Sequence, residues 1–295
     1  MFYISFLLWL RNSVQAGVAS CISIFRILLM SKIVPAITPN TDQSEAVILG
    51  NGPSLRQTLD KHLPYLSQTT NFAVNGMVLS PHYESLQPAY YLLVAPEFYL
   101  PETTTFHQDL RQKIFQNIAE RTHWKMTVVM NAMGKNSPVL KDLFAQHPHV
   151  QLRFMNLTPV EGYSSLRFWA YRNNIGSVRP HNVLLPSILL AINLGYKKIS
   201  IVGADHSWHE EVRIDPQNNT MTINHEHFYD ARQQTGMMYQ LSGATYYIHD
   251  FFRKIYLAFG GYHELKQYAT AQKANITNCS EKSYIDAFER GTLGA

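Results

Sequence analysis

A glycine-rich turn directly after an apolar run is the first place in this sequence where ligand binding can be expected. The run Val47-Ile48-Leu49 leads into Gly50-Asn51-Gly52-Pro53-Ser54. Glycines allow a backbone to approach a ligand closely, and the free N–H groups at the beginning of a following helix attract phosphate. Asn51, and Asn75 after the next apolar run, can each donate and accept hydrogen bonds. The turn is therefore predicted to hold a phosphate, a ribose or a pyrimidine edge, with a purely local tight turn as the alternative.

The same turn does not fit the fingerprint of nicotinamide-dinucleotide sites. Leu55 stands where the third glycine of that fingerprint belongs, and Asn75 stands where an acidic residue should end the second strand. A nicotinamide cofactor is therefore not expected.

Histidines are numerous after the second glycine turn, but their spacing does not favour a metal. The pairs His206-x-x-His209 and His225-x-His227 match no standard zinc signature, and no cysteine accompanies them. No metal site is predicted.

A general base is a better use for one of these histidines, because imidazole titrates near neutral pH. His227 precedes Phe228-Tyr229, and neighbouring aromatic rings can hold it in a defined orientation. His227 is the first choice for the base, His225 and His249 are rivals, and a structural role remains the alternative for each.

Two further side-chain types are candidates for the same site. Asp205 ends the apolar run before the second turn, where it could bind a metal, orient a histidine or cap the following turn. Trp208, Tyr229 and Tyr239 could donate to a leaving phosphate or stack on a sugar.

Short apolar runs, separated by helical or loop segments, would position these residues. Several runs are continuous rather than alternating, as in strands that are covered on both faces of a parallel sheet. The predicted strands are 46–49, 72–74, 90–94, 126–130, 151–155 and 199–202. The fold class expected is α/β, with a Rossmann-like, doubly wound, mostly parallel sheet that binds ligands at the carboxyl ends of its strands.

The chain is expected to divide into five parts. After an N-terminal helix over 1–32 come a polar linker over 33–44, a single Rossmann-like domain over 45–205, a lid over 206–240, and C-terminal helices with a last strand over 241–295. The lid segment is polar and lacks a clear strand–helix rhythm. A helix over 242–272 is predicted to bend near Gly260-Gly261.

The N-terminal helix is predicted to be amphipathic and to lie in a membrane interface. One helical stripe is apolar, whereas Asn12, Gln15, Ser23 and Arg26 fall largely outside it. The stripe consists of Leu7, Leu10, Val14, Val18, Cys21, Phe25 and Leu28. Packing on the protein's own body or on a second subunit is the first alternative, and a spanning helix or a cleaved signal is the second. The expected location is cytoplasmic, peripheral on the inner membrane.

Composition excludes some partner classes. A net charge of +4 over 295 residues suggests weak attraction to anions, and the lack of Lys/Arg runs argues against nucleic acid. Cys21 and Cys279 show neither metal spacing nor a disulfide framework.

Three features together resemble a known family. "VILGNGPSL", the Asn that ends the second strand, and "LAINLGYKKISIVGAD" followed by a His-containing lid are similar to the bacterial sialyltransferases of glycosyltransferase family 42. The turn is also similar to that of 6-hydroxymethylpterin diphosphokinase-like domains. The resemblance implies a GT-A-like variant with one Rossmann domain. It also implies metal-independent transfer of a sugar from a CMP-activated donor, without any cofactor besides the donor itself.

By position, the resemblance assigns roles to residues of this chain. It implies that Gly50, Asn51 and Ser54 bind the phosphate and ribose of the donor. It further implies that Asn75 corresponds to the family's asparagine after strand two, Asn182 contacts donor phosphate or sugar, Gly203 lines the cytidine pocket, lid tyrosines assist the leaving phosphate and His227 is the base.

The sequence also departs from the family pattern. Ala95-Pro96 replaces an Asn-Pro, Asn182-Val183 replaces the Thr-Ser pair that grips sialic acid, and Ser207-Trp208 stands where a tyrosine is expected. These departures leave the transferred sugar open: besides the sialic acid that the resemblance implies, pseudaminic acid, legionaminic acid or Kdo, also carried on CMP, would fit a changed sugar pocket. The implied partners are the nucleotide sugar, a bacterial surface-glycan or glycolipid acceptor, and the cytoplasmic membrane surface through residues 1–30. A homo-oligomer is also possible.

Two other functions are compatible with these residues. The first is a Mg²⁺-dependent phosphotransferase of the pterin diphosphokinase-like type, and the second is a non-catalytic nucleotide-binding protein.

Overall fold

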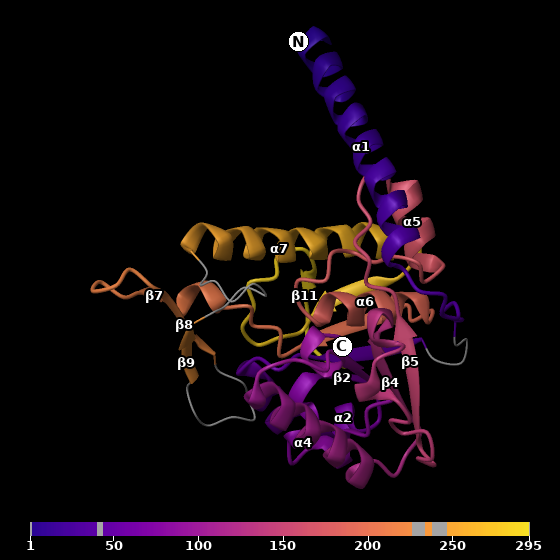
Figure 1. Cartoon of the computed structure of the whole chain (residues 1–295), viewed down its shortest axis with the longest axis vertical. Coiled ribbons are helices and arrows are strands. Elements are labelled where there is room, and N and C mark those ends of the chain that lie inside the picture. The colour runs from indigo at the N-terminus through magenta and orange to yellow at the C-terminus, as the bar shows by residue number, and fades with distance from the viewer. Residues whose placement is uncertain (1, 40–43, 226–233, 238–246, 295) are drawn as a thin grey trace.

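The computed structural model describes residues 2–39, 44–225, 234–237 and 247–294, and at its centre lies an eight-stranded sheet (Figure 1). The strand order is β11-β10-β6-β1-β2-β3-β4-β5, and every neighbouring pair is parallel. The strands are β1 Glu45–Leu49, β2 Asn71–Val74, β3 Tyr90–Leu93, β4 Met126–Asn131, β5 Val150–Met155, β6 Lys198–Val202, β10 Asn275–Asn278 and β11 Glu289–Arg290. The predicted α/β fold and its six predicted strands are confirmed.

The sheet is doubly wound, and alternate residues of its central strand β1 enter two separate cores. Ala46 and Ile48 belong to one core cluster, whereas Val47 and Leu49 belong to the other. All four side chains are fully buried, which explains why the strands read as continuous apolar runs.

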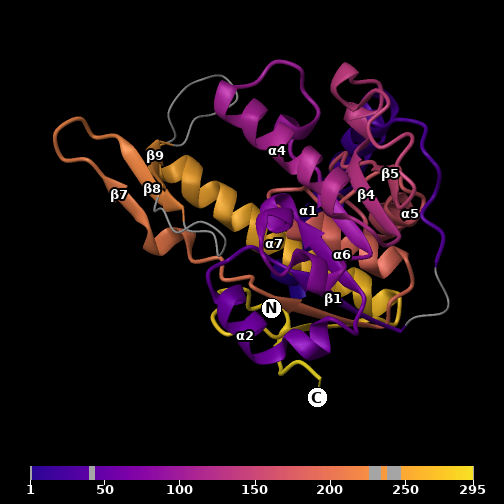
Figure 2. The same cartoon turned by 90° about the horizontal axis from the view of Figure 1, so that it is seen from below.

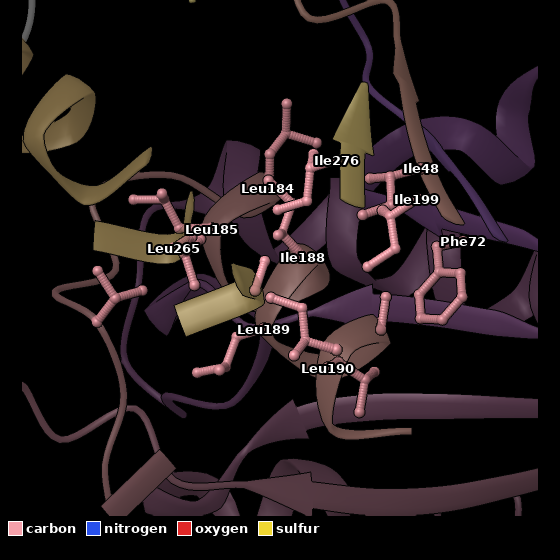
Figure 3. Close-up of a cluster of buried hydrophobic side chains, with 14 of the residues drawn as sticks. Ile48, Phe72, Leu184, Leu185, Ile188, Leu189, Leu190, Ile199, Leu265 and Ile276 are labelled. Atoms are coloured by element: carbon pink, nitrogen blue, oxygen red, sulfur yellow. The ribbon is translucent and has the colours of Figure 1, made fainter. Parts of the chain in front are cut away.

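Helices cover both faces of the sheet. α5, α6 and α7 supply the first core, and Figure 3 shows Leu185 and Leu265 of this layer beside each other, in the same cluster as Ile48 of the sheet. α2 and α4 supply the second core from the opposite face. The helices are α1 Phe2–Met30, α2 Ser54–Leu66, α3 Tyr83–Leu86, α4 Thr105–Arg121, α5 Ser164–Arg172, α6 Leu184–Asn193 and α7 Ile248–Ala271. Short 3-10 turns are η1 Asn75–Leu79, η2 Pro96–Phe98, η3 Ala132–Gly134, η4 Pro138–Leu140 and η5 Trp208–Glu210.

The topology creates a switch point beside β1. The chain runs outward from β1 through β2, β3, β4 and β5, and then returns to β6 on the other side of β1. Connections leave β1 and β6 in opposite directions, so a crevice opens at the carboxyl ends of these two strands.

The bend that was predicted in α7 is wrong. α7 runs as one helix through Gly260-Gly261 and is straight in Figure 1. The reason is packing. A Cβ atom on Gly261 would lie 3.0 Å from Leu185 Cδ1, so this glycine serves the close approach of α7 to α6.

The predicted lid segment contains a small antiparallel sheet where no strand rhythm was recognised. Its strands are β7 Val212–Ile214, β8 Met221–His225 and β9 Gln234–Met237, and they project from the side of the molecule (Figures 1 and 2). Met221 is buried against Phe251 of α7, and Trp208 and Val212 pack beside this pair. The small sheet therefore rests on the beginning of α7.

The predicted N-terminal helix is present as α1, and its polar side is fixed to the body. Ser23 is fully buried, its hydroxyl donates to Glu161 O at 3.1 Å, and Glu161 N donates back to it at 2.8 Å. Tyr163 N donates to Ser20 Oγ at 3.0 Å. Gly162, at φ +99°, allows this approach, because a Cβ atom there would lie 2.7 Å from Ala16 O.

The other side of α1 is apolar and exposed. Leu7, Val14, Val18 and Phe25 of the predicted stripe all lie on the surface. By length and composition alone, the segment 5–30 could cross a membrane. The helix thus packs on the body along one side and exposes an apolar stripe along the other.

Candidate functional site

A cavity of about 470 Å³ lies at the carboxyl ends of the parallel strands, at the switch point. Its walls come from the turns after β1, β2, β3, β4 and β6 and from the segment 180–184 that leads into α6. The residues with polar side chains in this wall are Asn51, Asn75, Asn131, His181, Asn182, Asp205, His206, Ser207, Trp208 and Glu211.

The two glycine turns are joined to each other at the base of the cavity. Gly50 N donates to Val202 O and Gly52 N donates to Gly203 O, both at 2.8 Å. Gly203 has a φ of +63°, and a Cβ atom on it would lie 2.6 Å from Gly50 O. These glycines therefore permit backbone-to-backbone contact between the turns, while Gly52 and Gly203 also line the cavity.

Asp205 occupies the beginning of α2. Ser54 N donates to its carboxylate at 3.2 Å, and Ser54 Oγ donates to Oδ2 at 2.8 Å. Leu55 N and Arg56 N are also bonded, to Gly52 O and Pro53 O. The expectation of free N–H groups here is therefore wrong, because the carboxylate and the turn already satisfy them. Burial raises the pKa of Asp205, and the hydrogen bonds from Ser54 oppose that rise.

Two asparagine side chains in the cavity wall carry an oxygen that accepts no hydrogen bond from the described residues. Asn51 Nδ2 donates to Val74 O at 3.0 Å, which fixes the amide and leaves Oδ1 as an acceptor. Asn51 Oδ1 and Asn75 Oδ1 are both buried and have no hydrogen-bond partner among the described residues. Asn75 itself adopts a left-handed conformation at φ +47°. Buried polar atoms in native proteins are nearly always paired, so these two oxygens are available to accept hydrogen bonds from a water or a ligand.

Asn182 supplies a matching donor. Its Oδ1 accepts hydrogen bonds from Leu184 N at 2.9 Å, Leu185 N at 3.2 Å and the Tyr262 hydroxyl at 3.1 Å. The Nδ2 group is therefore the donor end, and it is buried without a partner in the described structure. Nε2 of the neighbouring His181 is in the same condition.

His206 contacts Tyr262, the residue whose hydroxyl donates to Asn182. Its Nε2 lies 2.6 Å from the Tyr262 hydroxyl, and its ring lies 4.2 Å from the Trp208 ring, centroid to centroid. The Tyr262 hydroxyl gives its one proton to Asn182 Oδ1, which can only accept, so His206 Nε2 must carry a proton. Burial lowers the pKa of His206 to about 3, and the ring is neutral at pH 7.

The similarity of this chain to known proteins is found at the level of structure. No protein-family model matches it, and no curated protein matches its sequence. Among solved structures, the chain is similar to the MAf glycosyltransferase from Magnetospirillum magneticum AMB-1, with 14% identity and a TM-score of 0.49. The match covers 90% of this chain and 37% of that chain. At this distance it assigns neither a family nor an activity to the present chain.

The structure brings together most of the residues that were selected from the sequence. Those that line the cavity are Asn51, Gly52, Asn75, Asn182, Gly203, Asp205 and Trp208. Gly50 and Ser54 lie behind them, bonded to Val202 and Asp205. His227, Tyr229 and Tyr239 lie outside the described residues. His225 ends β8, and His249 is exposed beside Asp250 on α7.

Sequence reasoning missed His181, His206 as a partner of Tyr262, and Tyr262 itself. His206 directly follows the Gly-Ala-Asp turn, which was a usable signal of its place at the sheet edge. Tyr262 carried no such signal, because its contact with Asn182 joins residues 80 positions apart.

The charge of the cavity wall is acidic. Asp205 and Glu211 are the charged residues in the described wall, which contains no Lys or Arg. Within the described ranges, no three His, Cys, Asp or Glu side chains gather where they could hold a metal ion. The described wall is therefore best suited to the neutral, hydrogen-bonding parts of a ligand.

Proposed function

We propose that the protein is a glycosyltransferase that moves a nonulosonic acid-type sugar from a CMP-activated donor to a bacterial surface-glycan acceptor. One observation carries this proposal. Asn51, Asn75 and Asn182 line the cavity at the switch point, and each carries a buried polar atom, Asn51 Oδ1, Asn75 Oδ1 and Asn182 Nδ2, without a hydrogen-bond partner among the described residues. Ribose and sugar hydroxyls and a pyrimidine edge offer the complementary donors and acceptors.

The proposed reaction breaks the bond between the sugar's anomeric carbon and the CMP phosphate oxygen. The acceptor hydroxyl oxygen forms the new bond to that carbon and gives its proton to a histidine, and CMP leaves with the electron pair. The Asn182 amide would hold the donor's phosphate or sugar, and hydrogen-bond donors such as Tyr229 would stabilise the leaving phosphate.

His227 remains the proposed base, and His206 is assigned a positioning role. A base needs a pKa near the working pH and a free nitrogen toward the substrate. His206 has a pKa of about 3 and commits its Nε2–H to Tyr262. It therefore serves to orient Tyr262 and, through it, the donor end of Asn182.

The proposed location is the cytoplasmic face of the inner membrane. The exposed apolar stripe of α1 supports this placement, because water disfavours such a continuous surface. A lipid-linked glycan acceptor at the same membrane would be within reach of a protein held there.

Nucleotide binding tests the proposal directly. Thermal unfolding would be measured with CMP, CDP, UDP, GDP or ATP, each with and without Mg²⁺. CMP at a hundredfold excess over its Kd should raise the midpoint by about 5 °C without metal. Asn182→Asp keeps the acceptor oxygen but replaces the donor, so it should abolish the shift. Asn173→Asp, on an exposed residue that follows α5, is the matched control.

The other outcomes distinguish the alternatives. A shift with ATP and Mg²⁺ alone would refute the CMP-sugar proposal in favour of a phosphotransferase. No shift with any nucleotide would refute nucleotide-dependent transfer altogether.

A further inference from the structure

α1 packs against the body through several specific contacts and is not joined to it by a flexible linker alone. Its contacts extend beyond Ser20 and Ser23 to an ion pair between Arg26 and Glu161 at 2.9 Å. After the helix ends, Ser31 Oγ bonds to Thr158 Oγ1 at 2.8 Å and Lys32 N bonds to Asn156 Oδ1 at 2.9 Å. The direction of α1 relative to the sheet is therefore fixed. Whatever medium receives the apolar stripe must also lie close to the face of the body from which α1 leaves.

α7 covers that face. Figure 1 shows α1 rising from the side of the molecule where α7 lies, with α2 and α4 on the opposite side. α7 buries Phe251, Ala258 and Leu265 against the body. Phe252 and Tyr256, one helical turn apart on its outward side, are 52% and 76% exposed.

α5 continues this surface beside α1. Tyr163, at the beginning of α5, donates from its hydroxyl to Ser13 O at 2.9 Å, so the two helices are in contact. Trp169 of α5 is 53% exposed. Tyrosine and tryptophan with one apolar side and one polar edge are the residues that membrane interfaces favour.

The charge of the three helices is complementary to anionic lipid. α1, α5 and α7 contain no exposed Asp or Glu in the part of the chain that the structure describes. Their exposed basic residues are Arg11, Arg172, Arg253, Lys254 and Lys266. Basic residues near a bilayer are attracted to the anionic headgroups of the cytoplasmic leaflet.

We infer that α5 and the outward side of α7 rest on the same lipid surface that receives α1, so that the protein meets an anionic bilayer with one defined face. α1 supplies the apolar insertion, Trp169, Phe252 and Tyr256 lie at headgroup depth, and the basic side chains contact the headgroups. The inference rests on the membrane attachment proposed for α1 and is independent of sugar transfer.

The experiment places one additional indole on either side of the molecule. Tyr256→Trp adds it to the outward side of α7, and Phe106→Trp adds it to α4, where the native side chain is 55% exposed. Each full-length variant is mixed with vesicles of phosphatidylcholine and phosphatidylglycerol that carry brominated acyl chains. Relative to wild type, Tyr256→Trp should gain quenchable fluorescence and Phe106→Trp should gain only unquenched fluorescence.

A flotation assay supplies the energetic test. Phe252→Ser with Tyr256→Ser should weaken binding to the anionic vesicles about tenfold, whereas Phe106→Ser should leave it unchanged. Vesicle binding with an unquenched indole at position 256 would overturn the inference while leaving α1 as the anchor. Failure of the wild type to bind vesicles would overturn both, and a concentration-dependent dimer would then assign the stripe to a second copy of this chain.

Discussion

At the scale of single residues, neighbours decide which atom of an ambiguous side chain meets the ligand. The Asn182 amide commits its oxygen to three donors, and its nitrogen is thereby the atom left for a further hydrogen bond. One of these donors is the Tyr262 hydroxyl, whose own orientation depends on His206. A neutral His206 is thus built into the site, and its neutrality has a thermodynamic consequence.

The consequence is a loss of stability in mild acid. The pKa of His206 is lowered from 6.5 to about 3 in the folded protein by burial. Below pH 6.5 the histidine is protonated in the unfolded chain but stays neutral in the folded chain. The contribution of this residue to stability is therefore present above pH 6.5 and is lost as the pH falls. The free energy of unfolding should drop by about 2 kcal/mol between pH 6.5 and pH 5 from this residue alone.

Urea unfolding of the wild type and of His206→Asn at both pH values measures that difference. Asparagine tolerates the left-handed backbone at this position, where φ is +54°. The variant should be less stable at pH 6.5 but should lose about 2 kcal/mol less on acidification to pH 5. Equal pH dependence in the two proteins would show that His206 is not held neutral.

At the scale of helices and strands, the sequence mainly predicted strands that are covered on both faces of the sheet. β1 to β4 are apolar and buried on both faces, so a continuous run identified them, whereas β5 alternates with exposed Gln151 and Arg153. β10 is the predicted last strand, whereas β11 is short and carries exposed Glu289 and Arg290, and β7 to β9 lie in a polar segment, so no such run marked these four strands. The expected bend in α7 failed because glycine was interpreted as flexibility, whereas its role is close packing.

The two adjacent glycines of α7 should respond oppositely to the same substitution. Gly260 has open space around its Cβ position, so Gly260→Ala should stabilise the protein by about 1 kcal/mol through helix propensity. Gly261→Ala gains the same propensity but forces a methyl group against Leu185 and Val178, and it should cost about 1–3 kcal/mol. Differential scanning calorimetry of both variants compares them, and an equal response would refute the packing role of Gly261.

At the scale of the whole molecule, the topology explains why so many site residues were found without a structure. Asn51, Asn75, Gly203 and Asp205 follow the ends of parallel strands, and parallel strands bring their ends to one edge of the sheet. What could not be predicted is the layer behind this edge. Tyr262 comes from α7, and Asp205 rather than a ligand occupies the beginning of α2. Both depend on long-range packing that no local pattern encodes.

The attachment of α1 should contribute to the stability of the whole protein as well as to its location. Deleting residues 1–30 removes the bonds of Ser20 and Ser23 to the segment 161–163 and should cost about 3 kcal/mol of unfolding free energy. Leu7→Ser with Leu10→Ser changes only the exposed stripe and should leave stability unchanged while weakening vesicle flotation. Chemical unfolding of both proteins in vesicle-free buffer measures these free energies of unfolding. An unchanged value after the deletion would show that α1 does not stabilise the fold.

A rigidly docked anchor would also change how the protein searches for its acceptor. The mouth of the cavity would stay at a constant height above the bilayer. The protein would then meet its acceptor by lateral diffusion in two dimensions rather than in three. The encounter rate would then follow the number of acceptor molecules per unit of membrane area, in the manner of an effective concentration. Diluting the vesicles would leave the turnover of bound protein unchanged, whereas diluting the acceptor within each vesicle would slow it.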